Sequence, residues 1–68
     1  MTPRERRMRS LVTQLVICLT RRDNAALERD RPYTDPERRA VLAARWVRLC
    51  DEQDDLEAQL AMLQRSEP

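Results

Sequence analysis

A regular repeat of apolar residues in the second half of the chain constrains the fold most. Its members are spaced alternately four and three residues apart, and only one of them is polar: Leu42, Trp46, Leu49, Gln53, Leu56, Leu60 and Leu63. This heptad spacing predicts a helix that packs along its length against another helix. At 1.5 Å per residue, the line is roughly 33 Å long.

The first half of the chain predicts a second long helix with a wider apolar side. Thr2-Pro3-Arg4-Glu5 is a helix start, with Thr2 as the cap and Pro3 in the first turn. The apolar residues that follow cover an arc of about 160° on a helical projection; they are Met8, Leu11, Val12, Leu15, Val16, Cys18 and Leu19. An arc this wide predicts contact with two neighbouring helices.

One break separates the two helices. Pro32 disfavours helix at Arg31, and Thr34-Asp35-Pro36-Glu37 repeats the start signal with either Thr34 or Asp35 as cap. The predicted fold is all-α, a single domain over residues 1–68: a helix at about 3–29, a turn at 30–34 and a helix at about 36–64. Two such helices fold back antiparallel, and residues at one height should have numbers that sum to roughly 65. This pairing places Leu15 level with Cys50, and Cys18 level with Val47 and Trp46.

A single hairpin cannot cover both apolar sides, so the sequence predicts a symmetric homodimer that forms a four-helix bundle. A domain of 68 residues is also marginal without such support. The expected core of the bundle contains Leu11, Leu15 and Cys18 together with the heptad line from Leu42 to Leu63. Gln53 in that line either bonds its symmetry mate across the dimer axis or lies exposed at the edge.

Composition argues against catalysis. The chain has no histidine, glycine or lysine, so it lacks the commonest general base, phosphate-cradling loops and Schiff-base chemistry. The acids from Asp51 to Glu57 lack the pattern of a calcium loop and are expected to form a solvated face. We therefore expect no enzyme activity, no metal, no other cofactor and no small-molecule substrate.

The expected location is cytoplasmic, without contact to a membrane. The apolar segment from Leu11 to Leu19 is too short to span a bilayer. Cys18 and Cys50 are then expected to be free, small, buried side chains. Their similar height in the hairpin would also permit a disulfide.

Arginines supply two candidate surfaces. Arg4, Arg6, Arg7 and Arg9 cluster at the start of the first helix; they either pair with the acids from Asp51 to Glu57 or contact nucleic-acid phosphates. The second candidate is a protein-binding surface of Ile17, Arg21, Arg31 and Tyr33. Ile17 falls outside the apolar arc, and packing explains neither Arg31 nor Tyr33 at the turn, although a merely exposed turn would look the same.

The predicted architecture resembles the Rop family of plasmid copy-number regulators, which are helical hairpins that dimerise into four-helix bundles and bind RNA loops. It is also similar to small phage- and plasmid-encoded inhibitors of bacterial regulators. The second resemblance implies a protein that binds and modulates another protein, such as a transcription regulator. The first implies RNA binding through the arginines of the first helix as an alternative.

Overall fold

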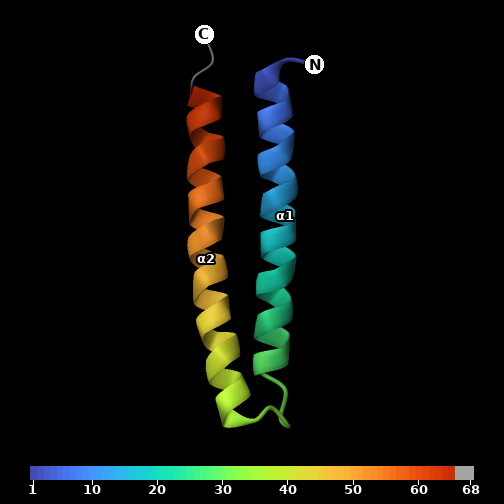
Figure 1. Cartoon of the computed structure of the whole chain (residues 1–68), viewed down its shortest axis with the longest axis vertical. Coiled ribbons are helices and arrows are strands. Elements are labelled where there is room, and N and C mark those ends of the chain that lie inside the picture. Colours follow the sequence, from blue (N-terminus) through green and yellow to red (C-terminus); the bar gives the residue numbers. More distant parts are fainter. Residues whose placement is uncertain (66–68) are drawn as a thin grey trace.

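The structure is a computed structural model that describes residues 1–65. Within them the chain forms two helices, α1 (Pro3–Arg29) and α2 (Pro36–Arg65), which lie side by side and antiparallel. Figure 1 shows the start of α1 and the end of α2 at the same end of the hairpin. The prediction of an all-α helical hairpin is confirmed, and the helix bounds agree with the predicted ones to within one residue.

Short polar side chains start both helices. The Thr2 hydroxyl accepts a hydrogen bond from the Glu5 backbone N–H at 3.2 Å. At the second start, the Asp35 carboxylate accepts from the Glu37 N–H at 3.3 Å, so Asp35 rather than Thr34 caps α2. Each bond satisfies a backbone donor that a helix start would otherwise leave without a partner.

The turn closes without glycine because it needs no left-handed residue. No residue among those described has a positive φ. The Asp30 N–H donates to the Ala26 carbonyl at 3.0 Å, which completes the last turn of α1. The Thr34 hydroxyl then donates to the Glu28 carbonyl at 2.6 Å and holds the returning chain against the end of α1.

A line of buried residues seven positions apart runs along each helix. In α1 and α2 these are Leu11, Cys18, Ala25 and Leu42, Leu49, Leu56, all less than a tenth exposed. Paired in antiparallel order, 11 with 56, 18 with 49 and 25 with 42, their numbers sum to 67 in each case. The Cys18 thiol donates to the Leu49 carbonyl at 3.1 Å, which confirms this alignment at the centre.

The observed alignment corrects the predicted one by about two residues. Cys18 lies level with Leu49 rather than with Val47 and Trp46, and Leu15 lies level with Glu52 rather than with Cys50. The turn causes the difference: α2 begins below the level at which α1 ends, so that its first turn extends past α1 (Figure 1).

The hairpin is one layer thick, with Cα extents of 52 × 17 × 12 Å. Two helices can bury only the line that each turns toward the other. Of the ten residues predicted for the bundle core, Leu11, Cys18, Leu42, Leu49 and Leu56 are buried in the hairpin itself. The other five are half-buried: Leu15, Trp46, Gln53, Leu60 and Leu63.

Candidate functional site

One face of the hairpin is apolar over most of its length. It consists of the residues that follow each buried position by one and by four. Residues at these two spacings project from the same side of their helix. Because the helices are antiparallel, these positions of α1 and α2 share one face of the hairpin. Its apolar members, called the apolar face below, are Met8, Val12, Leu15, Leu19 and Ala26 in α1 and Ala43, Trp46, Cys50 and Leu60 in α2.

The apolar face is only partly covered. Val12 is 47% exposed, and Val16 on its border is 58% exposed. Leu15, Leu19 and Trp46 are half-buried. Soluble proteins seldom leave a continuous apolar patch of this length open unless it binds something.

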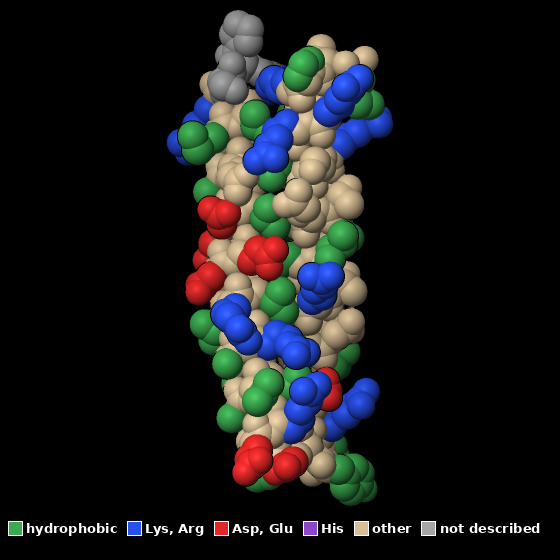
Figure 2. Space-filling model, in the orientation of Figure 1, with side chains coloured by type: hydrophobic (Ala, Val, Ile, Leu, Met, Phe, Trp, Pro, Cys, Tyr) green, Lys and Arg blue, Asp and Glu red, His purple; other side chains and the backbone are tan. Residues whose placement is uncertain are grey.

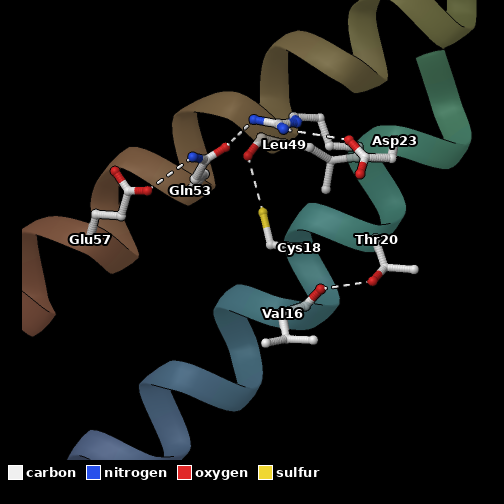
Figure 3. A network of polar contacts seen from close by, with 8 residues as sticks. Val16, Cys18, Thr20, Asp23, Leu49, Gln53 and Glu57 are labelled. Atoms are coloured by element: carbon white, nitrogen blue, oxygen red, sulfur yellow. Dashed lines mark hydrogen bonds and ion pairs between the residues drawn. The ribbon is translucent and has the colours of Figure 1, made fainter.

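A polar network crosses the middle of the apolar face (Figure 3). Arg22 donates from Nη1 to the Gln53 Oε1 at 2.6 Å, and Gln53 donates from Nε2 to the Glu57 carboxylate at 2.9 Å. Arg22 also forms an ion pair with Asp23 at 3.4 Å. Nearer the turn, the Arg29 guanidinium lies over the Trp46 ring, 5.7 Å from its centroid. Gln53, the polar member of the heptad line, thus has both amide atoms hydrogen-bonded within its own chain.

The two cysteines are free and differ in surroundings. Cys18 is buried at the helix interface, whereas Cys50 is half-buried on the apolar face. Burial raises the pKa of the Cys18 thiol above its usual 9.0, and the nearby Glu52 carboxylate raises it further against the opposing effect of Arg22. Cys18 is therefore a protonated, unreactive packing residue at neutral pH.

The opposite face is polar. It consists of the residues three and six places after each buried position, among them Gln14, Ile17, Arg21, Asn24 and Glu28 in α1 and Arg45, Arg48, Glu52, Asp55 and Gln59 in α2. Figure 2 looks onto this face, where charged side chains of both signs flank the groove between the helices and hydrophobic ones appear within it. Ile17, 45% exposed, is an apolar exception on this face.

The polar face contains a groove of about 570 Å³ in the half nearer the turn. Ala25 and Leu49, both buried, are among its lining residues, and Arg21, Arg45 and Arg48 surround them. Among residues 1–65, no side-chain hydrogen bond or ion pair occupies any of these three guanidinium groups. Glu28 and Glu52 line the same groove, so the groove carries negative as well as positive charges and is not uniformly basic.

A second hollow, of about 590 Å³, lies at the turn. Arg31 and Tyr33 line it, and Tyr33 is 97% exposed. Glu28 borders both hollows, and its carboxylate holds Arg38 at 3.2 Å. The predicted partner-binding residues Arg21, Arg31 and Tyr33 therefore follow one edge of the molecule.

Ile17 extends this edge, since it lies one helical turn before Arg21. Sequence reasoning missed Arg45 and Arg48 as members of the surface. Arg45 lies three residues after the buried Leu42 and four before the buried Leu49, and Arg48 directly precedes Leu49. This spacing was the available signal, because it places both arginines beside the heptad line.

The N-terminal arginines lie at the far end from the turn. Arg4 donates from Nε and Nη2 to the Leu63 carbonyl at 3.2 and 2.9 Å, and Arg7 donates to the Gln59 side chain at 2.8 Å. The alignment places residues 4–9 level with residues 58–63, beyond the acids of residues 51–57. These bonds of Arg4 and Arg7 therefore do not go to the acids with which pairing was expected. Arg6 and Arg9 are exposed.

The part of the chain that the structure describes shows neither a metal site nor a membrane-spanning helix. Residues 1–65 contain no group of three or more metal-ligating side chains that could hold an ion. Neither helix over this range combines the length and hydropathy needed to cross a bilayer. Comparisons with protein-family models, with curated proteins and with solved structures found no match to this chain. The two faces of the hairpin are therefore the features that bear on function.

Proposed function

We propose that this chain is a non-enzymatic helical protein that forms a homodimer through its apolar face and binds another protein through its polar face. Binding would modulate or inhibit the partner. The observation that carries the proposal is the difference between the two faces of the hairpin. One face is apolar and partly uncovered, and the other has a groove with three arginines whose guanidinium groups have no side-chain partner within residues 1–65.

A second copy is the occupant that best fits the apolar face. The face runs along both helices, so only a partner of similar length covers it, and an identical hairpin has that length. Stacking two hairpins would bury Val12, Leu15 and Trp46 and would supply the core that a 68-residue domain otherwise lacks. The product is the four-helix bundle, with two-fold symmetry.

The polar face stays open in this dimer and fits a protein that carries acidic residues. Arg21, Arg45 and Arg48 can each make bidentate bonds to carboxylates, and Tyr33 and Arg31 belong to the residue types that dominate binding energy at interfaces. Glu28 and Glu52 in the groove would repel a continuous phosphate backbone. A bacterial transcription regulator is the class of partner that the resemblance to small inhibitors suggests.

Affinity capture from a bacterial lysate tests the protein-binding proposal. The tagged chain should retain one partner after nuclease treatment, and an Arg45→Ala, Arg48→Ala variant should lose it. Arg65→Ala, which removes an exposed arginine outside the groove, is the matched control and should bind normally. Loss of capture on nuclease treatment, or equal capture by both variants, would refute the proposal.

RNA binding is the second candidate. Arg6 and Arg9 are exposed, and neither has a side-chain partner within residues 1–65, so they remain open to phosphates. An Arg6→Ala, Arg9→Ala variant should then lose RNA affinity, and the affinity of the parent should fall steeply with salt. A labelled RNA hairpin titrated at two salt concentrations distinguishes this candidate from protein binding.

A further inference from the structure

The apolar face carries charges of opposite sign at its two ends. Arg22 and Arg29 lie in the half near the turn, four places after the buried Cys18 and Ala25. Glu57 and Glu5 lie in the half near the N-terminus, and Glu57 follows the buried Leu56 directly. The face is thus basic toward the turn and acidic toward the open end.

Neighbouring acidic residues reduce the positive charge near the turn without cancelling it. Asp23 and Asp30 form ion pairs with Arg22 and Arg29 at 3.4 and 3.2 Å. Both acids are well exposed, with side chains 67% and 70% accessible, whereas the two arginine side chains are only 29% and 31% accessible. Arg22 and Arg29 lie four places after a buried position and Asp23 and Asp30 five, so the guanidinium groups lie closer to the seam between the helices than these carboxylates do.

We infer that two copies of this chain stack antiparallel, with their turns at opposite ends, and that Arg22 of each copy pairs with Glu57 of the other. This inference rests on the proposed dimer and specifies how it is built. Antiparallel stacking places the basic half of one face on the acidic half of the other. Parallel stacking would place like charges at the same height, which interfaces avoid.

The alignment of the hairpin supports this arrangement independently of charge. Glu57 lies level with residue 10 of α1, because the numbers of level residues sum to 67. Midway between residues 10 and 22 is residue 16, which is also the midpoint of α1 (Pro3–Arg29). Two copies related by a two-fold axis at that height, perpendicular to the helices, would overlap along the full length of α1. Arg22 of one copy would then lie at the height of the other copy's Glu57.

The position of the Arg22 side chain argues against the parallel alternative. Arg22 reaches from α1 across the helix interface to Gln53 of α2, so its guanidinium lies over the seam between the helices. A two-fold axis parallel to the helices would run along this seam. It would bring the two Arg22 guanidinium groups against each other in a water-poor interface.

Spin-label distance measurement tests the arrangement. A nitroxide would be attached at the turn in a Tyr33→Cys variant whose Cys18 and Cys50 are replaced by alanine, after sedimentation shows that this variant is dimeric. Antiparallel stacking predicts a label separation close to the 52 Å length of the hairpin. Parallel stacking predicts less than about 25 Å, because adjacent helices lie only 8–10 Å apart.

Charge exchange supplies a second readout. Arg22→Glu and Glu57→Arg should each weaken dimerisation at least tenfold, and the double variant should recover most of that loss. A short turn-to-turn distance, or a double variant weaker than both single ones, would overturn the antiparallel arrangement and leave the dimer intact. A monomeric parent protein would instead overturn the proposed dimer itself.

Discussion

Replacing Leu42 by alanine tests the most buried contact of the hairpin. Leu42 is fully buried, with 0% exposure, and lies level with Ala25, whose side chain is too small to fill the space left behind. Leucine-to-alanine changes in cores cost about 2–5 kcal/mol, and the cost rises with the cavity that remains. We therefore expect a loss of about 3 kcal/mol, which corresponds to roughly 12–24 °C in melting temperature for a domain of this size.

The assay is urea unfolding followed by circular dichroism at one fixed protein concentration, because the stability of a dimer depends on concentration. Leu27→Ala is the matched control: Leu27 is 67% exposed on the outer side of α1, and its replacement should change stability by less than about 0.5 kcal/mol. A loss of less than about 1 kcal/mol for Leu42→Ala, or equal destabilisation of the two variants, would contradict close packing around Leu42.

Three further predictions follow from individual side chains. Gln53→Leu should raise the melting temperature, because it replaces a polar residue in the heptad line with an apolar one. It should also broaden the distribution of spin-label distances, because polar residues in such a line fix the register of helices. A single unchanged distance would show that Gln53 does not fix the register. The pKa of Cys18 is raised in the folded state, so the unfolded chain loses its thiol proton first, and the melting temperature should fall as pH rises above about 9. Cys18→Ala should reduce that fall, and an equal fall in this variant would contradict the assignment to Cys18. Tyr33→Ala should leave the melting temperature unchanged and should weaken partner binding by about 1–3 kcal/mol in calorimetry; equal affinity would remove Tyr33 from the surface.

The sequence predicted the two helices well because their signals are local. Thr2 and Asp35 cap the helices through hydrogen bonds to residues two or three positions away, and the heptad line requires only the period of a helix. The alignment between the helices was predicted about two residues wrong. It depends on the path of the turn, where the Thr34 hydroxyl binds the Glu28 carbonyl, and that path has no periodic signal.

The surfaces were predictable only in part. The 160° arc indicated that α1 has a second apolar side, and the exposure of Val12 and Val16 agrees with it. The groove was not predicted, because it requires Arg21 of α1 and Arg45 and Arg48 of α2 to meet across an interface whose alignment was still unknown. The link between Arg22 and Gln53 was missed for the same reason: the two are 31 positions apart.

Sedimentation equilibrium of two glutamate variants tests most directly whether a second copy covers the apolar face. Val12 and Ile17 have nearly equal exposure, 47% and 45%, but Val12 lies on the apolar face and Ile17 on the polar face. The proposed bundle predicts a dimer for the parent and for Ile17→Glu at micromolar concentration, and a monomer or a much weaker dimer for Val12→Glu. A folded monomer for the parent, or identical behaviour of the two variants, would contradict it.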